Sequence, residues 1–196
     1  AALQDLPPAE QVRAHANAAL ACAHRGDADG AQALLEQATD QAARHDDDPQ
    51  AARALAALAH NLAAHLRESP ARSPQATALM IEAATRSRAA WASVGGWLEI
   101  ERADWHLAMC HAAAGQGEDA LVHARATVAA CEAHGADGFE FCFAWQALAE
   151  AALAAGQAAL ARQARDAMAA RQAEVTDPGF AAYAAEQLAA IDARLG

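Results

Sequence analysis

Aromatic residues are scarce in this chain of 196 residues. Phe, Trp and Tyr together account for 5% of the sequence although hydrophobic residues account for 55%, and most of the apolar residues are alanine. Alanine is the strongest helix former and is depleted in β-strands. The composition therefore disfavours a β-rich protein and predicts an all-α fold, and the length suits a single domain over 1–196.

Positive charge is also in short supply. The sequence has no lysine, so its 14 basic residues are all arginine, against 25 acidic residues and a formal net charge of −11. Sequence-independent binding to nucleic acid requires a clustered cationic face that displaces counterions. Because the sequence shows no such cluster, we do not expect direct binding to DNA or RNA.

Long hydrophobic runs and paired cysteine motifs are missing as well. No apolar run reaches the roughly 18 residues of a membrane-spanning helix, and no signal-peptide pattern is present at the N-terminus. The four cysteines, Cys22, Cys110, Cys131 and Cys142, occur singly without CxxC spacing, which is typical of free thiols in a reducing compartment. We therefore expect a soluble, cytoplasmic protein with no membrane contact.

Catalytic motifs are absent from the sequence too. It contains no GxSxG, HExxH or glycine-rich phosphate loop, and "GQGEDA" (115–120) lacks the third glycine and the preceding strand of a dinucleotide site. An enzyme assembled from scattered helical residues stays an alternative, because one sequence does not reveal site geometry. Our expectation is a protein that is not an enzyme and has no cofactor.

Capping residues and prolines mark where helices begin. Asp48, Ser73 and Asp177 each precede a proline, which is well tolerated at the first helical position, and Asp137 and Glu140 form a capping-box pattern. Between these signals apolar residues recur at helical spacing. The sequence predicts nine helices, over 8–25, 28–45, 49–67, 74–92, 97–114, 117–134, 138–155, 158–174 and 178–195.

A short pattern of small residues recurs around three glycines, Gly26, Gly115 and Gly156. Alanine stands seven residues before each glycine and five residues after it, at Ala19, Ala108, Ala149, Ala31, Ala120 and Ala161. Glycine adopts positive φ readily at a helix C-terminus, and facing alanines allow two helices to pack closely. Each glycine is therefore predicted to form the turn of an antiparallel helical hairpin.

The glycine spacing predicts a fourth hairpin. Gly115 and Gly156 are 41 residues apart, whereas Gly26 and Gly115 are 89 apart, roughly two such periods. The glycine-free stretch "RESPARSP" (67–74) is the expected turn of the hairpin between them. This gives approximate hairpins over 8–45, 49–92, 97–134 and 138–174, followed by a capping helix over 178–195.

This pattern resembles the tetratricopeptide-repeat (TPR) family, which stacks helix–turn–helix units. The fourth hairpin matches best, with Trp145, Leu148, Ala149, Gly156 and Ala161 where the family prefers bulky and small residues. The first keeps Ala19, Gly26, Asp27, Ala31 and Ala38, and the third keeps Leu107, Ala108, Gly115 and Ala120. The period exceeds the family's 34 residues and the proline at the end of each unit is missing, so the chain is more similar to the long-period helical repeats of bacterial regulators.

The resemblance implies a right-handed α-α superhelix, a TPR-like solenoid, that serves as a non-catalytic protein–protein interaction scaffold. Such arrays bind a peptide or helix of a partner on the concave surface lined by their first helices. By the family's register, that surface includes Arg13, Asn17, His24, Asn61, His65, Arg102, Trp105, Met109, Gln146 and Glu150. Some relatives hold a peptide carboxylate with asparagine and basic residues, and Asn17, Asn61 and Arg102 stand at comparable register.

The histidines suggest an alternative function. His106 and Cys110 are four residues apart on one predicted helix face, and His60 and His65 lie on an earlier helix. They would allow a metal-binding or small-molecule sensor, although a metal site needs three or four converging ligands and the sequence places only two. Half-buried packing residues are the simpler interpretation, and no metal is expected. A third alternative is self-association into a homodimer.

Overall fold

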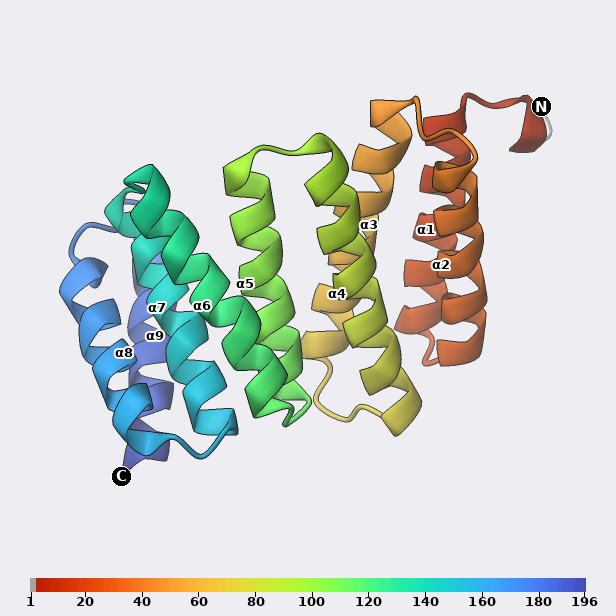
Figure 1. The fold of residues 1–196 in the computed structure, drawn as a ribbon. Helices are drawn as coiled ribbons and strands as arrows, with labels where there is room; N and C mark the ends of the chain where they lie inside the picture. Colours follow the sequence, from red (N-terminus) through yellow and green to blue (C-terminus); the bar gives the residue numbers. More distant parts are fainter. Residues whose placement is uncertain (1–2) are drawn as a thin grey trace. The chain divides into compact units, whose positions relative to one another are not determined.

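The computed structural model describes residues 3–196, which form nine α-helices after a short 3-10 helix (Figure 1). The helices are α1 (Pro8–His24), α2 (Ala28–Ala43), α3 (Pro49–Glu68), α4 (Pro74–Val94), α5 (Trp97–Ala113), α6 (Gly117–His134), α7 (Gly138–Ala154), α8 (Ala158–Gln172) and α9 (Pro178–Leu195). All nine predicted helices are confirmed. Their starts coincide with the predicted ones, and their ends agree to within two residues.

Side-chain caps explain why several starts could be read from the sequence. The carboxylate of Asp137 accepts a hydrogen bond from the backbone N–H of Glu140 at 3.1 Å, as a capping box requires. Asp48, Ser73 and Asp177 cap α3, α4 and α9 in the same way, each just before the proline that opens the helix. These local bonds satisfy backbone donors that a helix leaves unpaired at its N-terminus.

The three turn glycines have the predicted left-handed conformation. The φ angles of Gly26, Gly115 and Gly156 are 75°, 74° and 70°. The six alanines of the repeated pattern are all fully buried, with 0% exposure for Ala19, Ala31, Ala108, Ala120, Ala149 and Ala161. The turn between α3 and α4 has no glycine, and there the Arg72 guanidinium donates to the backbone oxygen of Arg67 at 2.6 Å.

The chain divides into two compact units, and each is described separately. In the first unit, up to His106, α1 packs against α2 and α3, and α4 packs against α2 and α3. The helices form two layers, with α2 and α4 in front of α1 and α3 in Figure 1. Residues 97–106 of α5 complete this unit, whose largest fully buried side chains include Val12, Leu35, Leu62, Leu79 and Met80.

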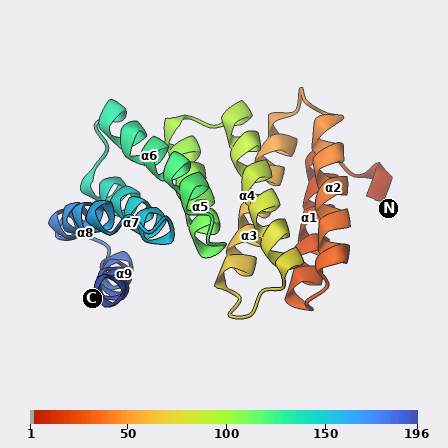
Figure 2. The ribbon, with the colours of Figure 1, turned by 60° about the horizontal axis from the view of Figure 1, so that its bottom comes forward.

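The second unit begins at Leu107 and is built around α7. Helix α7 packs against α6, α8 and α9, as the turned view in Figure 2 also shows. Its buried side chains include Leu121, Met168 and Ile191. The structure thus confirms an all-α fold in which helices pack mostly with their neighbours in hairpin-like pairs. The single domain over 1–196 stays a prediction.

The cysteines and the membrane prediction can be compared with the structure directly. All four cysteines are buried, and all four are free thiols, as predicted. Among residues 3–196, no helix has the length and apolar character needed to cross a bilayer.

Candidate functional site

The predicted residues of α1 lie on its outer face. Arg13 and Glu10 form an ion pair at 2.6 Å, one turn apart, and both side chains are largely solvated. Asn17 is exposed one turn further along, and His24 is exposed at the end of the helix. Separations of three, four and seven residues along the helix place these side chains in one row.

The outer face of α3 adjoins this row. Asn61 is exposed, and His65 is partly buried because its ring contacts the ring of His24, with 4.0 Å between the ring centroids and an angle of 55° between the planes. This contact joins α1 directly to α3. The sequence predicted both histidines on one surface, and the structure brings their rings together.

The third set of predicted residues comes from α5. Arg102 is exposed, whereas Trp105 is partly buried and lies under Arg67 of α3, whose guanidinium carbon is 5.4 Å from the ring centroid. Met109, partly buried, belongs to the second unit. Arg67 was not singled out from the sequence, although it follows His60 by seven residues and therefore lies on the same face of α3.

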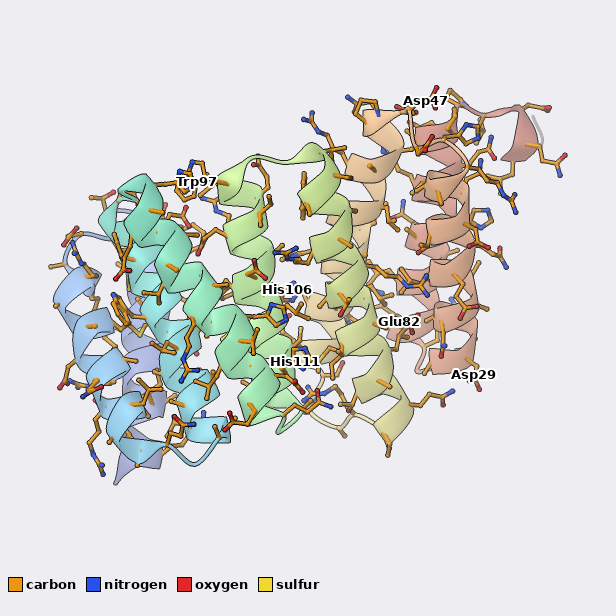
Figure 3. All side chains as sticks on the ribbon, viewed as in Figure 1. Asp29, Asp47, Glu82, Trp97, His106 and His111 are labelled. Atoms are coloured by element: carbon orange, nitrogen blue, oxygen red, sulfur yellow. The ribbon has the colours of Figure 1, made fainter. Side chains whose placement is uncertain are left out.

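His106 is almost completely buried, with 1% exposure. Its ring packs on the ring of His60 with 4.0 Å between centroids, and Figure 3 shows it midway along α5. Neither ring nitrogen of His106, nor the indole nitrogen of Trp105, has a hydrogen-bond partner within residues 3–196. Burial lowers the pKa of His106 to about 2, with smaller contributions from His60 and Arg67.

The geometry of these histidines does not suit a shared metal ion. A metal ion lies in the ring plane about 2.0–2.1 Å from the ligating nitrogen, so the centroids of two imidazole ligands stand about 5 Å apart. The rings of His60 and His106 are closer than this, at 4.0 Å, and their planes are tilted by 53° to one another. Among the described residues, no three or more His, Cys, Asp and Glu side chains converge as metal ligands.

A second histidine pair lies near the turn between α5 and α6. The rings of His111 and His123 are 5.7 Å apart between centroids and nearly parallel. Unlike His106, His111 is partly exposed and its Nδ1 lies 2.7 Å from Oε1 of Gln116. His111 is therefore partly solvated and hydrogen-bonded, whereas His106 is almost completely buried.

The predicted residues of α7 are held by α9. Gln146 is fully buried and its amide nitrogen donates to Oε1 of Gln187 at 3.1 Å. Glu150 forms an ion pair with Arg194, also of α9. Both side chains thus have partners within the second unit, which the register of α7 alone does not reveal.

The second unit has two further surface features. A depression of about 400 Å³ between α8 and α9 is lined by Arg165 and Asp192, which bind each other through two hydrogen bonds of 2.6 Å. Phe139 and Phe143 of α7 contact each other, with ring centroids 4.9 Å apart, and Phe180 of α9, which is 50% exposed, contacts Phe139. Neither feature collects reactive or ligand-binding groups.

The chain matches no protein-family model, and no curated protein matches it in sequence.

Proposed function

We propose that this protein is a non-catalytic interaction module of the TPR-like type. In this proposal four antiparallel hairpins and a C-terminal capping helix form a right-handed superhelix, and a peptide or helix of a partner protein binds along the first helices of the hairpins. A bacterial regulatory system is the setting that the long repeat period suggests. The resemblance of the sequence to TPR repeats is the basis of this proposal.

One observation carries the proposal furthest. The His24–His65 contact holds the outer faces of α1 and α3 side by side, so that Asn17 and Asn61 belong to neighbouring exposed rows. Exposed amides next to histidine and arginine side chains can donate hydrogen bonds to the carbonyl and carboxylate oxygens of a peptide. Such a surface supports recognition of an extended or helical segment rather than catalysis.

Preorganisation is the proposed mechanism. Packed helices hold these side chains in place before a ligand arrives, so that less conformational entropy is lost on binding. Arg102 and the two asparagines would satisfy polar groups of the ligand, and Trp105 would provide apolar contact area.

A selected peptide tests the proposal. We would isolate binders from a random peptide library displayed on phage, and then measure their affinity for the Asn61→Ala, Arg102→Ala and Trp105→Ala variants by calorimetry. We expect each variant to bind at least about tenfold more weakly, as for an interface residue worth more than 1 kcal/mol. Gln37→Ala is the matched control, because Gln37 is exposed on α2, in the other layer. If all four variants bind the peptide equally weakly, or if none of them binds it more weakly than the wild type, the result would count against the surface.

A small-molecule sensor is the second candidate. The unpartnered nitrogens of His106 and Trp105 favour it, because buried polar atoms are normally hydrogen-bonded. Elemental analysis together with native mass spectrometry of the purified protein would detect a stoichiometric metal or small molecule. If elemental analysis finds no stoichiometric metal and the native mass is that of the protein alone, the interaction module is the better proposal.

A further inference from the structure

His60 and His106 form a contact unlike the other histidine pairs of the protein. Their rings touch with 4.0 Å between centroids, where α3 packs against residues 97–106 of α5. The His24–His65 contact has the same centroid distance, but His24 is exposed to solvent. In the His60–His106 contact, by contrast, one of the two rings is almost completely buried.

We propose that the His60–His106 contact is an acid-sensitive joint: with both rings neutral it holds α3 against the first part of α5, and acidification shifts the equilibrium toward transient opening of this contact. The inference does not depend on what the protein binds. It concerns a regulatory response built into the fold of the first unit.

The dry environment of His106 is the first step of the argument. A protonated imidazole has two N–H donors and needs two acceptors or water. Neither ring nitrogen of His106 has an acceptor within residues 3–196, and the residue is only 1% exposed. A proton can therefore be accommodated only if α3 and α5 separate and admit water.

The neighbouring charges act in the same direction. From α3, His60 and Arg67 face His106, and both lower the pKa of its ring. From α4, Arg88 faces α5, where it is bound by Asp104 at 3.1 Å. On α5 itself, Asp104 and Glu101 lie about 140–160° around the helix from His106, because successive residues turn by about 100°. The positive charge of Arg67 therefore opposes protonation of the His106 ring, and the two carboxylates of α5 do not face the ring to offset it.

The pKa of His60 is lowered as well. Burial is the main cause, and the positive charge of Arg67 adds to it. Both members of the pair thus release protons when the contact forms. By linkage, each proton taken up on opening makes the open state more favourable as the pH falls.

Hydrogen exchange measured by mass spectrometry tests the joint. In the wild-type chain, the opening equilibrium of peptides from α3 and residues 97–106 is measured at pH 7.5 and pH 5.5, after correction for the intrinsic exchange rate. A histidine that is neutral when closed and titrates at about 6.5 when open raises that equilibrium about tenfold over this range. Peptides from α7, α8 and α9 are the internal control, because these helices contain no histidine.

Two variants separate the joint from general acid sensitivity. His106→Gln removes the titrating group with little change of volume. Between pH 7.5 and pH 5.5 we expect its opening equilibrium to rise by a factor about tenfold smaller than in the wild type. His111→Gln is the matched control on the same helix, because His111 is partly exposed and hydrogen-bonded. We expect this control to keep the full effect. Unchanged pH dependence in His106→Gln, or equal opening of α7 to α9, would overturn the proposal.

If His106→Gln does not fold, an NMR titration of the wild-type protein tests the proposal instead. In wild-type protein with labelled histidine, the imidazole nitrogen shifts of His106 are followed by NMR as the pH falls. We expect the ring to stay neutral until the α3 amides begin to exchange. Titration of His106 near pH 6.5 while those amides remain protected would refute the joint.

Discussion

The guanidinium carbon of Arg67 on α3 lies 5.4 Å from the ring centroid of Trp105 on α5. A cation over an indole face is attracted by the ring quadrupole, and such a contact is worth about 0.5–2 kcal/mol depending on solvent exposure. It joins the same two helices as the His60–His106 contact. The joint between α3 and α5 therefore combines a stabilising cation–π contact with a pair of neutral imidazoles.

Removing the cation should weaken the first unit. We expect Arg67→Ala to lower the free energy of unfolding by about 1 kcal/mol, and Arg67→Lys to lower it by less, because an ammonium keeps part of the attraction. Urea denaturation followed by circular dichroism would measure both variants. Identical losses for alanine and lysine would show that the charge over the ring contributes nothing.

Stability should fall in acid with a defined sign. The pKa of His106 is about 2 in the folded chain against an ordinary 6.5. The unfolded chain therefore binds a proton below pH 6.5 that the folded chain does not accept, so stability is highest above pH 6.5 and declines as the pH falls toward 2. We expect a loss of about 2 kcal/mol between pH 7 and pH 5 from this residue.

Urea titrations at a series of pH values measure this slope. Carboxylates add their own pH dependence near pH 4, so the comparison with His106→Gln should be confined to pH 5 and above. A curve for the wild type that is flat between pH 7 and pH 5 would contradict the expected loss.

Two glycines of the second unit should respond differently to alanine. Gly156 has a φ of 70° and open space around it, so Gly156→Ala should cost about 1 kcal/mol from the left-handed conformation alone. A methyl group on Gly117 would lie 2.2 Å from the backbone nitrogen of Ala155, so Gly117→Ala should cost more. Thermal unfolding would rank the two variants, and a milder effect at Gly117 would refute the close approach.

Larger side chains should expose how closely α7 and α8 pack. Ala161 on α8 is 0% exposed, and Ala161→Leu should lower the free energy of unfolding by about 1–3 kcal/mol, because the extra atoms cannot be accommodated without moving the helices. Ala159→Leu is the control, since Ala159 is exposed on the same helix. Denaturant midpoints would compare them, and a tolerated Ala161→Leu would contradict close packing there.

The helix starts and the turns were the most predictable features. An aspartate or serine before a proline acts through hydrogen bonds within one turn, as at Ser73 and Asp177, and needs no distant partner. Gly26, Gly115 and Gly156 are predictable for a similar reason, because positive φ is a property of the residue itself. The conformations of these caps and turns depend on residues that are close in the sequence.

The contacts between helices were much less predictable. Gln146 has the same register on α7 as a surface residue of a first helix, but α9 covers it and Gln187 bonds to it. Arg67 looks like an ordinary solvated arginine until α5 places Trp105 beneath it. Hydrophobic periodicity indicates which face of a helix is buried, not which distant side chain meets it.

The order and the starts of the helices were determined by the sequence alone, because caps, prolines and turn glycines act over a few residues. The tertiary structure decided that the ring of His106 is dry and lies against His60. That outcome depends on how α3 and α5 approach each other, which is set by the packing of many side chains far apart in the chain. A histidine's charge is governed by that packing, because burial and neighbouring charges decide the free energy of its protonation.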